Sequence, residues 1–337
     1  MKKYILNLIV FLVVGCGGGS GTSEATGDYF KYQWNINPNS IYYSNGRATR
    51  GADINLTSAW QNNRGGSVKV AVIDDCFNVS HEDIRDNVYL TYNANDDSAN
   101  VNGYNCHGME VAGVLGAVDN GFGIEGVAPK VKLILIKVNF STSPEGDYIK
   151  AFEYAKDHGA KVINCSWGSK DHNEPQSFKN EFSTLKDANI TIVFASGNGD
   201  SNNTKINLDQ NASIDDESED PSVIGVGATD ETNDVTYYSN YGSNIDILAP
   251  GGTWPLGIRT TSNNGYSDVV GTSFAAPTVS GVIALMYAKN PNLTFNDIYQ
   301  KITQTADKIG TQNGAVYNNG FDTYRAYGKI NAGNALN

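Results

Sequence analysis

The stretch Val68-Lys69-Val70-Ala71-Val72-Ile73-Asp74-Asp75 is rich in β-branched residues and ends at two adjacent aspartates. A short apolar run of this kind is typical of a strand buried in a sheet. Four similar runs follow it along the chain, at residues 131–138, 161–165, 190–195 and 223–226. Each run is long enough for one strand, so these segments predict a sheet of at least five strands.

Segments with helical spacing lie between these runs. One begins near His107, a second covers residues 148–158 and stops at Gly159, and a third covers 178–188. Strands that alternate with helices predict an α/β fold whose mostly parallel sheet is covered by helices on both faces. Such sheets place their sites at the carboxyl ends of the strands, and we expect the functional residues there.

A longer helix is expected after Ser273. It is apolar almost all round, which predicts a buried helix, and Asn290-Pro291 ends it. Thr294, with Asp297 three residues later, predicts the N-cap of the next helix.

Composition limits the classes of function. The chain has 337 residues, 40% of them hydrophobic, which is enough for one large domain over 28–337, and we expect a monomer. Its formal net charge of -12 disfavours nucleic-acid binding, which needs a basic surface. An acidic surface of this kind attracts cationic peptides.

The first residues predict export. Lys2 and Lys3 precede an apolar run at 4–14 that is too short to span a membrane, as in a secretory signal. The run ends in Val13-Val14-Gly15-Cys16, which resembles a bacterial lipoprotein cleavage box, so we expect residues 1–16 to be the signal and Cys16 to be lipidated. Residues 17–27 then form a Gly/Ser-rich tether to a membrane, at the cell surface or in the periplasm. The alternative is an ordinary signal peptide with an incidental cysteine.

Three cysteines remain once Cys16 is assigned to lipid. Cys76 and Cys106 each adjoin a candidate catalytic residue, whereas Cys165 ends one of the apolar runs. An odd number cannot be a complete disulfide set. A Cys76–Cys106 disulfide and buried free thiols both remain open at this point.

Four residues together could carry acyl transfer, which needs a nucleophile, a base, a carboxylate that orients the base, and donors for the oxyanion. Asp74 ends the first strand, and His107 opens a helix whose dipole would lower the imidazole pKa. Ser273 lies at the N-terminus of the buried helix, where backbone N–H groups face a developing anion. Asn198, in Ala195-Ser196-Gly197-Asn198-Gly199, offers a side-chain amide to the same oxyanion.

The order Asp, His, Asn, Ser and the surrounding motifs resemble the subtilase family of serine endopeptidases. The matching motifs are Gly126-Val127-Ala128-Pro129, Asn164-Cys165-Ser166-Trp167-Gly168, Gly271-Thr272-Ser273-Phe274-Ala275-Ala276-Pro277 and Gly328-Lys329-Ile330-Asn331-Ala332. The resemblance implies a three-layer subtilisin-like fold and hydrolysis of protein or peptide substrates. It also implies that Ser166, Trp167 and Gly168 pair with the substrate backbone, and that Thr272 assists the oxyanion hole.

The same resemblance implies structural calcium. The oxygen ligands would come from two early aspartates and from a loop after the histidine helix. They are Asp28, Asp83, the carbonyls of Val118, Phe122 and Ile124, and Asn120. The alternative is an ordinary glycine-rich turn.

Some motifs are similar to those of the kexin and furin-like subtilases. These are Asp74-Asp75, Tyr92-Asn93-Ala94-Asn95-Asp96, Ser166-Trp167-Gly168 with Asp171, and Asn207-Leu208-Asp209. In that group the aspartates bind basic side chains, so Asp171 and Asp209 would face the P1 residue and Asp75 the P2 residue. Lys170 departs from the pattern. The acidic run Asp215-Asp216-Glu217, with Glu219-Asp220, is interpreted as a solvated loop. The competing hypothesis for the whole chain is a peptide-binding module without turnover.

Overall fold

The computed structural model describes residues 28–168, 174–210 and 216–337. Seven strands form a sheet with the order β2-β3-β1-β4-β5-β6-β7, in which every neighbouring pair is parallel. The strands are β1 (Lys69–Asp74), β2 (Val88–Asn93), β3 (Lys132–Lys137), β4 (Val162–Cys165), β5 (Thr191–Ala195), β6 (Val223–Thr229) and β7 (Ile247–Pro250). The predicted parallel α/β sheet is therefore confirmed.

The five predicted strands lie within the sheet, and the two edge strands were not predicted. β2 is only partly buried and carries Tyr, Thr and Asn among its apolar residues, so its pattern is weak. β7 has four residues, too few for a recognisable period. Low burial thus explains the weak pattern of β2 alone, because all four residues of β7 are buried.

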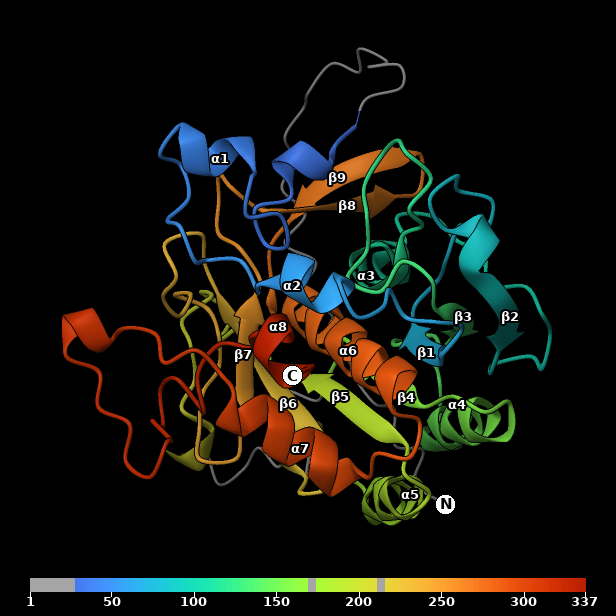
Figure 1. Cartoon of the computed structure of the whole chain (residues 1–337). Helices are drawn as coiled ribbons and strands as arrows, with labels where there is room; N and C mark the ends of the chain where they lie inside the picture. The colour runs from blue at the N-terminus through green and yellow to red at the C-terminus, as the bar shows by residue number, and fades with distance from the viewer. Residues whose placement is uncertain (1–27, 169–173, 211–215) are drawn as a thin grey trace.

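Helices cover both faces of the sheet, which gives the expected three layers (Figure 1). α3 (His107–Gly116) and α6 (Thr272–Lys289) pack on one face, in one continuous hydrophobic core. α4 (Glu145–Asp157) and α5 (Gln176–Asp187) cover the other face, where their aromatic residues form a second core. Because α6 lies in the middle of the larger core, it is apolar on almost every side.

The remaining elements lie around these layers. α7 (Phe295–Gln304) begins at the predicted cap, because the Thr294 hydroxyl accepts the Asp297 N–H and the Asp297 carboxylate accepts the Thr294 N–H. A hairpin of β8 (Ile258–Ser262) and β9 (Gly265–Val269) packs beside α3 (Figure 1). The short helices are α1 (Ile41–Ser44), α2 (Leu56–Trp60), α8 (Ala332–Ala335), η1 (Phe30–Tyr32), η2 (Arg85–Asn87), η3 (Leu208–Gln210), η4 (Glu217–Glu219) and η5 (Thr311–Asn313).

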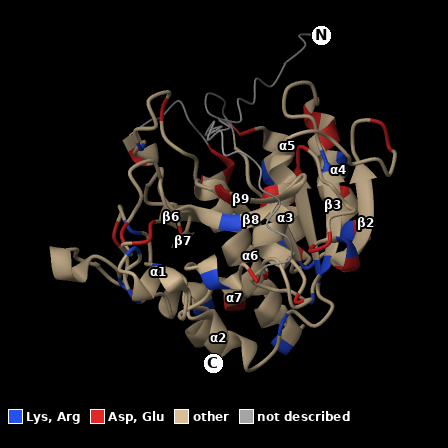
Figure 2. Cartoon of the chain, turned by 90° about the horizontal axis from the view of Figure 1, so that it is seen from above, with Lys and Arg blue, Asp and Glu red and all other residues tan. Residues whose placement is uncertain are grey.

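Charged residues are spread over the surface. Figure 2 shows Lys and Arg scattered among Asp and Glu over the described residues, without a single basic face. Within the described parts of the chain, none of the helices is long and apolar enough to cross a bilayer. The lipoprotein-type signal (1–16), its Cys16 and the tether (17–27) lie outside the described residues.

Candidate active site

Asp74 and His107 form a buried pair at the carboxyl end of β1. Asp74 is the last residue of β1, and His107 is the first residue of α3. The imidazole Nδ1 lies 3.0 Å from Asp74 Oδ1 and 3.2 Å from Oδ2. Because a carboxylate oxygen only accepts, Nδ1 is the donor, and the ring presents Nε2 on its opposite side.

The environment of His107 decides how readily it takes a proton. Burial lowers the pKa of the imidazole, but the charge and hydrogen bond of Asp74, with a smaller contribution from Asp75, raise it to about 9. The prediction that the helix start lowers this pKa is therefore wrong. An adjacent buried carboxylate acts at hydrogen-bond distance, and it outweighs the helix dipole.

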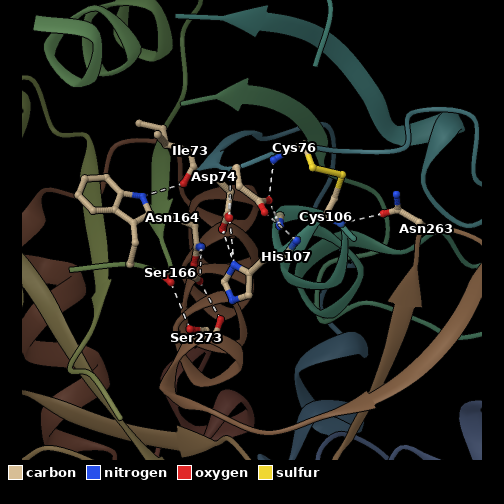
Figure 3. A network of polar contacts seen from close by, with 12 residues as sticks. Ile73, Asp74, Cys76, Cys106, His107, Asn164, Ser166, Asn263 and Ser273 are labelled. Carbon is tan, nitrogen blue, oxygen red and sulfur yellow. Dashed lines mark hydrogen bonds and ion pairs between the residues drawn. A yellow bond between two sulfur atoms is a disulfide. The ribbon is translucent and has the colours of Figure 1, made fainter. Parts of the chain in front are cut away.

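Ser273 lies in the first turn of α6, beside the imidazole. Figure 3 shows the His107 ring between Asp74 and Ser273. In this arrangement the Ser273 hydroxyl donates to the Ser166 carbonyl, at 3.2 Å, and not to His107. Catalytic hydrogen bonds are often loose before substrate binds, and rotation about the Cα–Cβ bond of the serine redirects its hydroxyl.

The Asn198 side chain is held in one orientation by Thr272. Its Oδ1 accepts the backbone N–H and the hydroxyl of Thr272, each at 2.8 Å. Its Nδ2 has no hydrogen-bond partner among the described residues. Gly271 has φ +147, and a Cβ there would lie 3.2 Å from Asn198 Nδ2, so glycine keeps this donor uncrowded. The amide therefore presents its N–H groups beside the start of α6.

A sequence profile of the subtilase family matches residues 65–328, a span that contains all four of these residues. The chain belongs to the subtilase family. It is 32% identical to the thermophilic serine proteinase of Bacillus sp. (strain AK1), over 89% of this chain and 69% of that protein. It is 31% identical to thermitase of Thermoactinomyces vulgaris, over 89% of this chain and 99% of thermitase. The subtilase is thus a serine-type endopeptidase.

Solved structures agree with this assignment. A protease of Pseudoalteromonas arctica PAMC 21717 superposes with a TM-score of 0.76 at 26% identity, over 92% of this chain and 98% of that one. The serine protease of Aeromonas sobria, solved with its chaperone, shares the fold, with a TM-score of 0.75 at 22% identity over 86% of this chain and 62% of that one. The subtilisin-like architecture expected from the sequence is confirmed.

The segment after β4 is fastened to the nucleophile. The Ser166 hydroxyl donates to the Ser273 carbonyl at 2.8 Å, and the Ser166 carbonyl accepts the Ser273 hydroxyl. The Trp167 indole donates to the Ile73 carbonyl at 2.9 Å, and its ring lies in the core of the α4 and α5 face. Ser166 to Gly168 is thereby fixed in position beside Ser273.

Asn164 and Ser280 also support this segment, and the sequence predicted no role for either residue. The Asn164 amide donates to the Ser166 hydroxyl, and its carbonyl oxygen accepts the Ser280 hydroxyl, each at 2.9 Å. The signal was present, because Asn164 interrupts an apolar strand and Ser280 interrupts an apolar helix. A buried polar residue needs a partner, but only the fold shows that these two are partners.

The aspartates predicted to bind basic side chains have different surroundings. Asp75 accepts the N–H groups of His107 and Gly108, at 3.3 and 3.0 Å, so its carboxylate caps α3. Asp209 is exposed and accepts the N–H and hydroxyl of Ser243. Asp171 lies outside the described residues. The P1 and P2 roles of all three aspartates stay predictions.

Asp216 and Glu217 are buried, with 5% and 0% of their surface exposed. The interpretation of residues 215–217 as a solvated loop is therefore wrong for these two residues. A Cβ built on Gly168 would lie 3.3 Å from Asp216 Oδ2 and 3.7 Å from Glu217 Oε2. Burial, and then the neighbouring Glu217, raise the pKa of Asp216. Two carboxyl groups thus lie directly beneath the segment predicted to bind substrate.

The residues expected to bind calcium lie together, and protein hydrogen bonds connect several of them. Asp83 is buried, and both of its oxygens accept hydrogen bonds from protein donors. The donors are the Asn120 amide, the Ile124 N–H and the Tyr266 hydroxyl, each at 2.9 Å. Asn120 Oδ1 accepts the Phe122 N–H at 3.2 Å, which holds this side chain within the loop. Asp28 pairs with Gly123 as an isolated bridge, and its carboxylate accepts the Phe30 N–H. Calcium binding by these residues stays a prediction.

Proposed function

We propose that this subtilase hydrolyses peptide bonds through an acyl-enzyme, with Ser273 as the nucleophile and His107 as the general base. The observation that supports this most directly is the buried Asp74–His107 pair, with Nδ1 and Oδ1 3.0 Å apart and the opposite side of the ring toward Ser273 (Figure 3). Asp74 fixes the tautomer and stabilises the imidazolium that forms when Ser273 loses its proton.

The reaction then proceeds in two balanced halves. Ser273 Oγ attacks the substrate carbonyl carbon while its proton passes to His107 Nε2, and the carbonyl oxygen becomes an oxyanion. Asn198 Nδ2 donates to that oxyanion, because its Oδ1 is already held by Thr272. His107 returns the proton to the leaving amine. Water repeats the sequence on the acyl-enzyme and releases the acid.

We propose further that the enzyme prefers basic P1 residues. Support comes from Asp216 and Glu217, whose carboxyl groups lie against Gly168. Tyr148 Oη is also buried, and it has no hydrogen-bond partner among the described residues. Burial, and then Glu217, raise the pKa of this hydroxyl, which indicates that it lies near the same carboxylates. A cationic side chain on the substrate would neutralise a buried acidic group of this kind.

The protein is, in this proposal, exported and anchored to a bacterial membrane through lipid on Cys16. Lys2, Lys3 and the apolar run at 4–14 support export, and the motif Val13-Val14-Gly15-Cys16 supports lipidation. The Cys76–Cys106 disulfide also supports it, because such bonds persist in oxidising compartments outside the cytoplasm.

Labelling with a fluorophosphonate tests the activity. The reagent bonds only to an activated serine, so we expect stoichiometric labelling of the wild type and none of Ser273→Ala. Ser44→Ala is the matched control, because it removes an exposed serine hydroxyl on α1, and it should still be labelled. Absence of labelling in well-folded wild-type protein would favour the non-catalytic peptide-binding module.

A further inference from the structure

The start of α3 is covalently joined to the end of β1. The Cys76–Cys106 disulfide links the second residue after Asp74 to the residue directly before His107. Both cysteines are buried, with 5% and 2% of their surface exposed. Figure 3 shows this bond beside the Asp74–His107 pair. The two residues that must stay in hydrogen-bond contact are therefore also tied together through the chain on either side of them.

Asp75 makes a second link between the same two elements. The N-cap residue of α3 is Cys106, whose side chain caps no N–H group. Asp75 replaces it from the neighbouring strand end, because its two carboxylate oxygens accept the N–H groups of His107 and Gly108. A carboxylate at a helix N-terminus is favoured by the helix dipole. The first turn of α3 thus depends on contacts from outside the helix.

A third contact comes from the β8–β9 turn. Asn263 Oδ1 accepts the Cys106 N–H at 3.1 Å, and Asn263 Nδ2 donates to the Gly103 carbonyl at 3.0 Å. A Cβ on Gly103 would lie only 2.3 Å from the Cys76 sulfur. The backbone at Gly103 therefore lies directly against the disulfide. Its neighbours Asn102 and Tyr104 are exposed, so movement of this loop would admit a small reductant.

The rest of α3 is held independently of these contacts. The Thr261 hydroxyl donates to the Met109 carbonyl at 2.8 Å, and the Thr260 hydroxyl to the Glu110 carbonyl at 2.6 Å. The helix also packs against α6 in the larger core. Loss of the disulfide should consequently loosen the first turn, which carries His107, and leave the body of the helix in place.

We propose that the Cys76–Cys106 disulfide and Asp75 form a clamp that positions His107 against Asp74, so that opening the disulfide reversibly lowers the activity of the folded enzyme. A dithiol opens it in two exchanges: one thiolate attacks a protein sulfur and forms a mixed disulfide, and the second thiol displaces it. The reductant leaves as its own disulfide, and Cys76 and Cys106 gain two electrons and two protons. This inference rests on His107 as the base proposed above.

The test compares wild type and Cys76→Ala/Cys106→Ala, each with and without dithiothreitol. Reduction should lower the kcat of the wild type at least tenfold and leave KM within twofold, and reoxidation should restore it. The double variant should have the lower kcat under both conditions, which makes it the control for other effects of the reductant. Its pH profile should also move, with the pKa of the base below that of the oxidised enzyme, because a displaced imidazole interacts less with Asp74. A merely structural disulfide would change neither kcat nor this profile.

Mass spectrometry after alkylation reports whether both thiols are free, and circular dichroism reports whether the protein is folded. Reduced, folded wild type with unchanged kcat and pH profile would refute the clamp. If the double variant fails to fold, the reduced wild type still decides the question. Oxidised wild type that neither cleaves peptides nor reacts with a fluorophosphonate would instead refute the proposed function, whatever the disulfide does.

Discussion

His107 is subject to two opposing influences on its proton. Burial favours the neutral imidazole, whereas the carboxylates of Asp74 and Asp75 favour the charged form and raise its pKa to about 9. Only the neutral ring can accept the proton of Ser273. Below this pKa most of the enzyme therefore carries a protonated base and is inactive, and the active fraction grows as the pH rises.

We accordingly predict that kcat/KM rises tenfold per pH unit at low pH and levels off above about pH 9. Steady-state assays with a fluorogenic peptide between pH 6 and 10 measure this rise in kcat/KM. A plateau already reached at pH 7 in the wild type would contradict the raised pKa of His107.

Asp74→Asn should lower kcat by about 10⁴, the loss known for this change in another serine protease, because the amide no longer fixes the tautomer of His107.

The segment 166–168, which is predicted to bind substrate, lies against helix η4 and its N-cap residue Asp216. η4 packs against β5 and β6, which places the Asp216 and Glu217 carboxyl groups beneath Gly168. The segment itself is fixed by Asn164 and Trp167. In the proposed specificity, this wall with buried carboxyl groups behind it would select substrates by charge as well as by shape.

Paired peptides with Arg or Leu at P1 test this arrangement. The wild type should have the higher kcat/KM for Arg, and Asp216→Asn/Glu217→Gln should lower the Arg to Leu ratio at least tenfold. Asp86→Asn is the matched control, because it makes the same change at an exposed aspartate that has no predicted substrate role, and it should leave the ratio unaltered. Equal or faster cleavage of the Leu peptide by the wild type would rule out the basic preference.

In the proposed function, the whole molecule combines a catalytic domain with lipid attachment at Cys16. The described domain begins at Asp28, which pairs with Gly123. In this proposal anchoring and catalysis depend on different parts of the chain.

We predict that Cys16→Ser moves the protein from the membrane fraction to the soluble fraction, with kcat/KM of the catalytic domain within twofold of wild type. Fractionation of expressing cells followed by immunoblotting measures the distribution. Ser20→Ala alters the tether without removing the thiol, so it should remain with the membrane. Recovery of Cys16→Ser in the membrane fraction would exclude lipid on this residue as the anchor.

The sequence by itself determined the parallel α/β fold, the five central strands and the four helices of the two layers. These are encoded locally, in apolar period and in end signals such as Thr294 with Asp297. It also singled out Asp74, His107, Asn198 and Ser273, because each lies at a strand end or a helix start within a recognisable motif.

The tertiary structure alone decided which side chains meet. It placed Asp74 where it raises the pKa of His107, and it buried Asp216 and Glu217. It also paired Cys76 with Cys106 in a disulfide, and it gave the Asp83 carboxylate three protein hydrogen-bond donors. Charge, burial and hydrogen bonding depend on distances between residues far apart in the chain, which local pattern does not contain. Acidic residues such as Asp216 and Glu217 can therefore be solvated in one fold and buried in another, and the local sequence does not show which.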